Sequence, residues 1–133
     1  MTTTNIIKNK STNIHYGDIV WVDLGVLCGS EQSGTRPALV ISNDKNNLHS
    51  PIISIVPLSS SKFKRDHKSY LPTHITISPN ETGVSGIDRD SVVMCEQTRA
   101  IDKSRVISKS GHIENQYIID ALNRALTIHF GVV

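Results

Sequence analysis

The sequence is poor in cysteine and has no long apolar run. Only two cysteines occur among 133 residues, Cys28 and Cys95, and they stand far apart. This excludes a disulfide-rich secreted scaffold and a structural zinc site built on pairs of cysteines. No apolar run approaches the ~18 residues that a membrane span requires, and the N-terminus has no apolar signal-peptide core. We therefore expect a cytoplasmic protein with reduced thiols and no membrane association.

Neither sign of charge dominates the chain, and the common cofactor motifs are missing. Fourteen Lys+Arg oppose 12 Asp+Glu, for a formal net charge of +2, which excludes a histone-like protein that binds by bulk charge alone. The chain has no phosphate-binding GxxxxGK, no dinucleotide-binding GxGxxG and no HExxH motif, and its six histidines lack metal-ligand spacing. We expect no cofactor and no metal.

The pattern of apolar residues predicts one mainly β domain. Residues 1–15 are polar and aperiodic, which indicates a flexible N-terminal tail, and residues 16–133 are long enough for a single domain. From about residue 114, apolar residues recur at spacings of three and four, as in an amphipathic helix. Before it, short apolar segments too closely spaced for parallel crossovers favour a small antiparallel barrel. We expect strands over 19–24, 36–42, 51–58, 73–77, 91–99 and 107–113, with a turn at 43–47 and a short helical turn at 101–106.

Polar residues gather at places where an ordinary barrel would not require them. The glycine- and serine-rich loop 25–35 ends at Arg36, whose planar, permanently charged guanidinium suits phosphate. Three serines, 59–61, directly follow an apolar strand, and the loop 59–68 that they begin is strongly basic. On the strand expected over 91–99, alternation would place Gln97 and Arg99 on one face and Glu96 and Thr98 on the other. A barrel with a solvated face and a surface salt bridge would also explain these features.

Several blocks together resemble the MazF/PemK family, the toxins of bacterial toxin–antitoxin pairs. A GSEQ…RP block, an HI strand and an EQxRxID block occur in that order, and the resemblance covers roughly residues 16 to 130. It implies a small SH3-like antiparallel β-barrel with a C-terminal α-helix, a homodimer, and metal-independent, sequence-specific cleavage of single-stranded messenger RNA. Such cleavage leaves a 2′,3′-cyclic phosphate and a 5′-hydroxyl. The matching residues are 17–24, 29–32, 36–44, 50–51, 71–75, 90–93, 96–99 and 101–103.

The resemblance also suggests site residues. It places the family's catalytic arginine at Arg36 and its catalytic hydroxyl, often a threonine, at Ser59, with Ser60 or Ser61 as alternatives. Gln97 matches a residue near the scissile site. We expect the two long loops to recognise RNA, one through amides and hydroxyls and one through positive charge that salt would screen. The candidate RNA-binding residues are Glu31, Gln32, Ser33, Thr35, Asn43, Ser60, Lys62, Lys64 and Gln97.

RNA carries its own nucleophile, the 2′-hydroxyl, so an enzyme needs mainly to align it and to stabilise the charged phosphate. We interpret Arg36 as an electrostatic clamp and leave the general base unassigned, with Glu31 as one candidate and the direction of His74 open. The resemblance implies a cognate antitoxin whose acidic disordered tail covers the site. Two alternatives remain at this point: a non-catalytic toxin of the same fold that binds DNA gyrase, and a barrel that only docks proteins.

Overall fold

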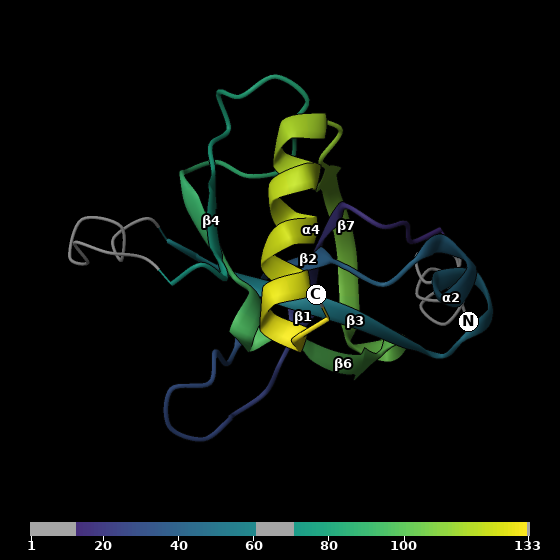
Figure 1. Cartoon of the computed structure of the whole chain (residues 1–133). Coiled ribbons are helices and arrows are strands. Elements are labelled where there is room, and N and C mark those ends of the chain that lie inside the picture. The colour runs from purple at the N-terminus through teal and green to yellow at the C-terminus, as the bar shows by residue number, and fades with distance from the viewer. Residues whose placement is uncertain (1–12, 61–70, 133) are drawn as a thin grey trace.

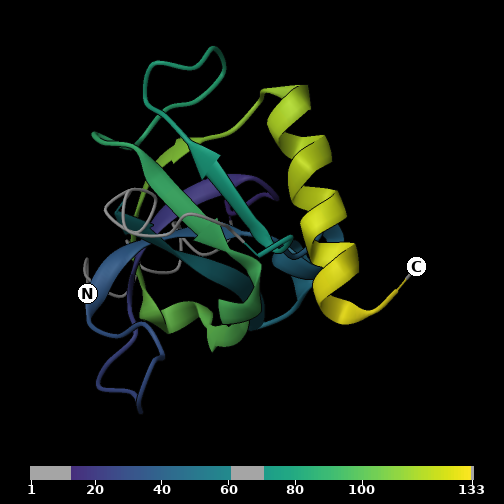
Figure 2. The ribbon, with the colours of Figure 1, turned by 60° about the vertical axis from the view of Figure 1, so that its left-hand side comes forward.

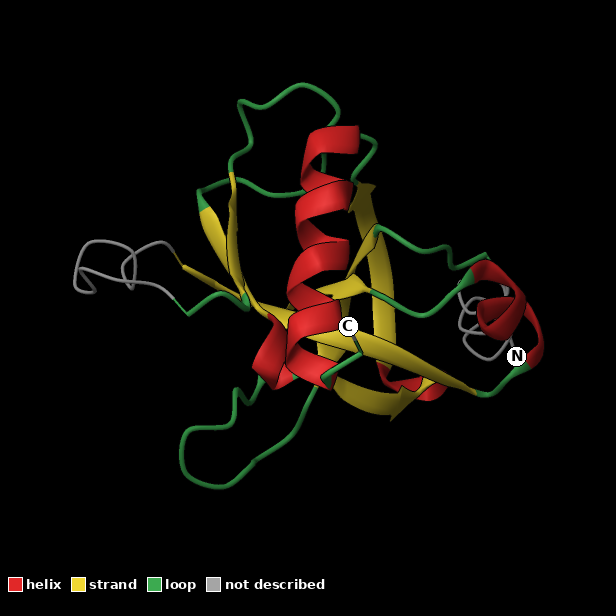
Figure 3. Cartoon of the chain, viewed as in Figure 1, coloured by secondary structure: helices red, strands yellow, loops and turns green. Residues whose placement is uncertain are grey.

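The computed structural model describes residues 13–60 and 71–132 (Figure 1). The chain forms a strongly bent antiparallel sheet with one long helix packed along one side, next to β4 (Figures 2 and 3). The elements are β1 (Asp18–Asp23), β2 (Thr35–Val40), α2 (Asp44–His49), β3 (Ile52–Ser60), β4 (His74–Ile77), β5 (Ser91–Met94), the 3₁₀ helix η1 (Cys95–Gln97), β6 (Arg99–Asp102), the 3₁₀ helix η2 (Lys103–Arg105), β7 (Val106–His112) and α4 (Gln116–Phe130).

The strand order is β4-β5-β3-β2-β1-β7, and β6 pairs with β3 outside this path. The long strand β3 pairs with β6 and β2 along its first part and with β5 at its end, so it carries the sheet around a bend. Within the described residues the outer strands β4 and β7 do not pair with each other. The fold is therefore the expected small antiparallel barrel with a C-terminal helix, but the strands leave it open on one side.

A loop closes part of this open side. Ser85 N donates a hydrogen bond to His112 O at 3.1 Å, and Val84 forms an isolated bridge with Ile113. Gly86 and Gly111 pack so closely that a Cβ built on Gly86 would lie 2.6 Å from the Gly111 backbone. Since real Cβ atoms do not tolerate such contacts, both glycines are needed for this approach.

Two apolar clusters form the core, one on each side of the bent sheet. The first includes Ile19, Leu39 and Val93 together with the buried face of α4. The second includes Val20, Val22, Ile53, Ile55 and Val106. Burying such side chains is the main favourable term in the stability of a domain of this size.

The N-terminal boundary differs from the expected one. We predicted a flexible tail through residue 15, but Ile14 is buried in the second cluster. His15 N donates to Asp18 Oδ2 at 2.8 Å, and Tyr16 N donates to Asp44 Oδ1 at 2.7 Å. The ordered domain therefore includes residues 13–15, while residues 1–12 lie outside the described part of the chain.

The C-terminal helix begins and ends where its capping residues allow. Asn115 Oδ1 accepts a hydrogen bond from Ile118 N at 3.1 Å, which satisfies a backbone donor of the first turn. Gly131 has a φ of 69° and ends the helix in the left-handed conformation that glycine adopts without strain. No helix in residues 13–60 and 71–132 is long and apolar enough to cross a membrane.

Three local predictions were wrong. Residues 44–49 form the helix α2 where we expected a turn, because Asn43 caps its first turn and six residues are too few to show a helical period. The strand predicted over 91–99 ends at Met94 and continues as η1 and β6, so the alternation predicted for residues 96–99 does not exist. The helical turn predicted over 101–106 covers only residues 103–105.

The chain leaves the β5 strand after Cys95, where the bond to Thr73 extends the β4–β5 register by one pair and Thr98 then takes the Cys95 carbonyl. Cys95 N donates to Thr73 O at 3.0 Å, and Cys95 O accepts from both the amide and the hydroxyl of Thr98. The hydroxyl bond is 2.7 Å long. These contacts close a single 3₁₀ turn, and they place the side chains of Glu96 and Gln97 beside the loop that precedes β2.

Candidate active site

Arg36, near the start of β2, is held by two segments of the chain. Its Nε donates to Ser33 O at 3.0 Å, and its Nη1 contacts Leu58 O at 3.4 Å. Within the described residues, Nη2 makes no hydrogen bond to protein. Nε and Nη1 are thus engaged with the protein, which leaves the N–H groups of Nη2 as the donors that can bind an oxyanion.

Ser59 lies at the end of β3, and its side chain is almost completely buried. Its Oγ is paired with the side-chain amide of Gln32. The amide orientation that satisfies all neighbours points Oε1 of Gln32 at Ser59 Oγ and at Arg36 Nη1, 2.9 Å away, and Nε2 at Pro57 O, 3.2 Å away. Gln32 therefore connects the predicted catalytic arginine to the predicted catalytic hydroxyl.

Gln97 fixes the loop that carries Gln32. Its Oε1 accepts from Gln32 N at 3.4 Å, and its Nε2 donates to Ser30 O at 3.1 Å. The base of the same loop is closed by two backbone bonds, Leu24 N to Gly34 O and Gly34 N to Gly25 O. The loop projects from the strands in Figure 1, but its inner side is anchored at both ends and in the middle.

Two cavities meet at Arg36. The first, which we call the loop cavity, has a volume of about 650 Å³. The second, which we call the Trp21 cavity, has a volume of about 580 Å³. Arg36, Ser59 and Ser60 line both. The loop cavity is otherwise lined by Gly29, Ser30, Glu31, Gln32, Ser33, Met94, Glu96 and Gln97.

A carboxylate with two partners lies at the edge of the loop cavity. Glu96 Oε2 is 2.7 Å from His74 Nε2, and Glu96 Oε1 accepts from the Thr73 hydroxyl at 2.8 Å. Burial raises the pKa of Glu96, but the hydrogen bonds from His74, from its own backbone amide and from Thr73 lower it more, and the net pKa lies below the usual value. Glu96 is therefore ionised at neutral pH. The side chain of His74, whose direction the sequence left open, points towards this carboxylate.

The structure brings most of the predicted site residues together. Glu31, Gln32, Ser33, Ser60 and Gln97 line the loop cavity with Arg36 and Ser59, and Thr35 lines the Trp21 cavity. Glu31 Oε1 accepts from Cys28 N at 2.8 Å, which orders the tip of the loop. The predicted RNA contacts Lys62 and Lys64, and the alternative hydroxyl of Ser61, lie outside the described residues.

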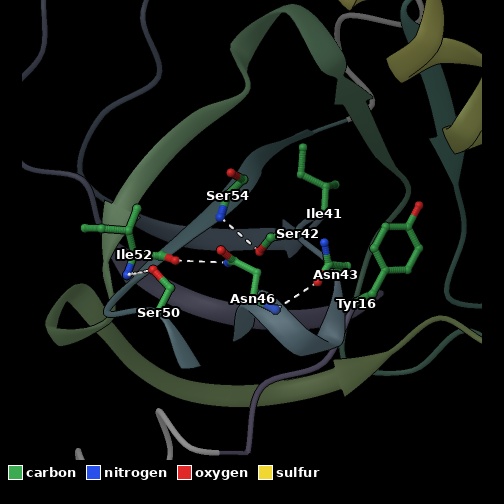
Figure 4. A pocket seen from close by; sticks show the side chains of 8 residues that line it. All are labelled: Tyr16, Ile41, Ser42, Asn43, Asn46, Ser50, Ile52 and Ser54. Atoms are coloured by element: carbon green, nitrogen blue, oxygen red, sulfur yellow. Dashed lines mark hydrogen bonds between the residues drawn. The ribbon is translucent and has the colours of Figure 1, made fainter. Parts of the chain in front are cut away.

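Asn43 is not brought to this site. Its side chain caps α2 and accepts from Asn46 N at 2.8 Å. It lines a different cavity of about 560 Å³, here called the α2 cavity, with Tyr16, Ile41, Ser42, Asn46, Ser50, Ile52 and Ser54 (Figure 4). None of these residues lines the loop cavity or the Trp21 cavity.

Sequence reasoning missed the second cavity at Arg36. We treated Trp21 only as a strand residue, although it stands between Val20 and Val22, both buried, and alternation turns it to the opposite face. This alternation could have indicated the exposed face of Trp21. It was obscured because the neighbouring strand residues on both sides of Trp21 are also apolar. In the part of the chain that the structure describes, no group of three or more His, Cys, Asp or Glu side chains is arranged to hold a metal ion.

Comparison with known proteins gives a consistent result. Residues 15–130 match a family model described as PemK-like, MazF-like toxin of type II toxin–antitoxin system. The chain is 37% identical to Endoribonuclease EndoA of Bacillus subtilis over 117 residues, which cover 88% of this chain and 94% of that protein. It is 34% identical to Endoribonuclease MazF of Staphylococcus saprophyticus over 116 residues, covering 87% of this chain and 90% of that protein.

A solved structure supports the fold independently. An endoribonuclease in complex with its cognate antitoxin, from a mycobacterial species, superposes with a TM-score of 0.68. The superposition covers 90% of this chain and 97% of that chain, at 19% sequence identity. At this identity the likeness concerns the fold alone, and it agrees with the open barrel and terminal helix described above.

Proposed function

The chain belongs to the family of PemK-like, MazF-like toxins of type II toxin–antitoxin systems, and we propose that it is a sequence-specific endoribonuclease that cuts single-stranded messenger RNA. The observation that carries this proposal is the guanidinium of Arg36, which Ser33 O and Leu58 O hold beside the hydroxyls of Ser59 and Ser60 where two cavities meet. The named relatives are endoribonucleases, and no relative described above supports the gyrase-binding alternative.

The chemistry requires few protein groups because the substrate supplies the nucleophile. The 2′-oxygen forms a bond to phosphorus, the bond from phosphorus to the 5′-oxygen breaks, and the products are a 2′,3′-cyclic phosphate and a 5′-hydroxyl. Arg36 would donate to the non-bridging oxygens, where charge develops, and a fixed donor of this kind is worth on the order of 10²–10³ in rate. Ser59 would donate to the same phosphate after releasing Gln32.

The proton of the 2′-hydroxyl must pass to a base, and the leaving 5′-oxygen must gain one. Arginine is a poor base because it stays protonated. Glu31 and Glu96 are the two carboxylates that line the loop cavity, and either can accept a proton directly or through water. The lowered pKa of Glu96 keeps it ionised, and its two hydrogen-bond partners hold it in place.

The family also suggests the partners. We propose a cognate antitoxin that covers the site with an acidic disordered segment, since Arg36 would attract its carboxylates and the binding would order the segment. We further propose a homodimer and a cytoplasmic location, where messenger RNA is found. Lys62 and Lys64, in the basic loop, stay predicted RNA contacts.

Incubation of the purified protein with a long single-stranded RNA in EDTA, followed by mapping of the new ends, tests the function. We expect cuts at one short motif, with 5′-hydroxyl ends. The variant Arg36→Ala should lose at least 10²-fold in rate. The matched control is Arg105→Ala, which removes an exposed arginine that also donates to a backbone carbonyl, Asp23 O at 3.1 Å.

Either of two results would contradict the proposal. If the folded wild-type protein leaves the RNA intact, it is not this nuclease. If Arg36→Ala cuts as fast as wild type, the assigned site is wrong. Circular dichroism of both arginine variants shows whether a loss of activity comes from unfolding.

A further inference from the structure

Trp21 is the only tryptophan of the chain, and it lies beside the proposed active site. It occupies the middle of β1, opposite Pro37 on β2 and Ser108 on β7. Although it is a large apolar residue within a strand, 39% of it is exposed. An indole left open to water next to a charged site is an unusual use of an aromatic residue, and aromatic faces of this kind bind other flat rings.

The Trp21 cavity has the chemistry of a site for a nucleotide. Its floor is apolar, formed with Trp21 by Pro37, Leu58 and Ile87, and one rim carries Arg36 with the hydroxyls of Ser59 and Ser60. Arg89 lies on another rim, and its side chain is largely exposed. Asp88 also lines this cavity, and its Oδ1 lies 3.3 Å from Arg89 Nε, an exposed pair that a phosphate would have to displace. An apolar surface with an arginine on each side matches a base flanked by two phosphates.

The wall that faces Trp21 is fixed to the sheet. Ile87, Asp88 and Arg89 directly follow Gly86, whose backbone lies against Gly111 of β7. The carbonyl of Gly86 accepts from Ser110 Oγ at 3.2 Å. The start of this segment is therefore anchored to β7 next to the cavity.

We propose that the Trp21 cavity binds the nucleotide next to the scissile phosphate, with its base stacked on the indole of Trp21 and its outer phosphate at Arg89. Nucleotides on the other side of the scissile phosphate then occupy the loop cavity, because Arg36 and Ser59 line both cavities. This inference rests on the proposed ribonuclease function and makes Trp21 a substrate-binding residue with no part in the bond-breaking step.

The single tryptophan makes the proposal directly measurable. The probe is a single-stranded RNA that contains the mapped cleavage motif and is 2′-O-methylated at the cleavage nucleotide, so that the nucleophile is blocked. We expect its titration into the wild-type protein to quench the tryptophan emission and to saturate. A DNA duplex of the same sequence serves as the control ligand, since its stacked bases are not free to enter the cavity.

Variants separate stacking from general loss of structure. Stacking of one base on an aromatic residue is worth about 1–3 kcal/mol, so Trp21→Leu should raise the Kd of a dye-labelled form of the same RNA roughly 5- to 150-fold. Trp21→Phe, which keeps an aromatic face, should bind within a few-fold of wild type. Leu48→Ala removes an exposed apolar side chain from α2, outside both cavities, and should leave the Kd unchanged.

The cleavage assay decides how a negative result is read. If the wild-type protein cleaves RNA but its tryptophan emission is not quenched, the stacking site is overturned and the nuclease function stands. The same conclusion follows if Trp21→Leu has a wild-type KM for the unmethylated RNA motif. Quenching by poly-glutamate but not by RNA would overturn it in favour of a peptide site. If wild type neither cuts nor binds RNA, the function itself fails, and the inference with it.

Discussion

Two polar cavities on this molecule look alike in composition but differ in how they are built. The loop cavity at Arg36 and the α2 cavity of Figure 4 are both lined by serine, asparagine or glutamine side chains. In the α2 cavity, Asn43 binds Asn46, Asn46 binds Ile52 O, and Ser42 pairs with Asn47, over separations of three to six residues. Longer contacts join them, because Ser42 Oγ also accepts from Ser54 N and the Tyr16 hydroxyl donates to Asn123 Oδ1, 107 residues away. These polar groups satisfy one another and hold α2 against the neighbouring segments.

In the loop cavity the partners come from distant parts of the sequence. Gln32 and Ser59 are 27 residues apart, Gln32 and Gln97 are 65 apart, and Ser30 and Gln97 are 67 apart. Arg36 brings a permanent charge into this network, and the α2 cavity has none. Both cavities therefore use contacts between distant segments, and the difference between them is the charged side chains Arg36, Glu31 and Glu96, which only the loop cavity has.

We expect the largest effect on the cleavage rate when one serine hydroxyl is removed from each of the two cavities. Ser59→Ala should lower the cleavage rate about 10²-fold, because a donor to the phosphate is lost. Ser42→Ala, the matched change in the α2 cavity, removes a hydroxyl that bonds Asn47 and Ser54, so it should cost stability and leave the cleavage rate near wild type. Initial rates on the motif RNA and urea unfolding measure the two quantities.

Two further serine variants decide the assignment within β3. Ser59→Thr keeps the hydroxyl and should stay within about tenfold of the wild-type rate, although the methyl added at this buried position should cost some stability. If Ser60→Ala is slower than Ser59→Ala, the catalytic hydroxyl belongs to Ser60, and our assignment of Ser59 is wrong.

A smaller effect is expected from the helix cap in the α2 cavity. Asn43→Ala removes the acceptor for Asn46 N and should cost about 1 kcal/mol of unfolding free energy, whereas Asn43→Asp keeps an acceptor and should cost less. Cleavage by Asn43→Ala should fall far less than cleavage by Ser59→Ala. A loss of activity comparable to that of Ser59→Ala would show that Asn43 contacts RNA after all.

The smallest effect concerns acid stability at the edge of the loop cavity. Because the pKa of Glu96 is lowered in the folded protein, its contacts with His74 and Thr73 stabilise the fold fully above the usual carboxyl value of 4.5 and lose this effect as the pH falls through the lowered pKa. Glu96→Gln should therefore lower Tm at pH 6 and give a shallower decline of Tm below pH 4.5. Glu114→Gln, at an exposed acid, is the control, and identical slopes for all three proteins would contradict the prediction.

The sequence predicted the fold where its patterns are long or its motifs specific. The spacing of apolar residues after Glu114 located α4 to within two residues, and the GSEQ…RP block placed Arg36 near the start of β2. The MazF/PemK resemblance is confirmed by the family match and the relatives. The site assignments to Arg36 and Ser59 stay predictions, although the structure brings these two side chains together through Gln32.

The missed features depend on contacts that a local pattern does not contain. η1 interrupts the predicted strand because the amide and hydroxyl of Thr98 turn back to the Cys95 carbonyl, which the apolar alternation does not reveal. The sequence predicts Gln32 only as an RNA contact, because its link between Arg36 and Ser59 depends on the pairing of β2 with β3. The exposure of Trp21 likewise follows from which face of β1 the two core clusters cover.

The pairing of β1 with β7 has a consequence for the timing of synthesis. Asp18 at the start of β1 binds His112 at the end of β7, 94 residues later, with Oδ1 and Nδ1 2.7 Å apart. At about 5–20 residues per second, β1 leaves the ribosome roughly 5–20 s before the strand that completes it. A nascent chain therefore contains Arg36 and Ser59 without the finished sheet that holds them. The site can therefore become active only after nearly the whole chain has been made. During this delay, a partner already present in the cell can reach the new chain before the site is complete.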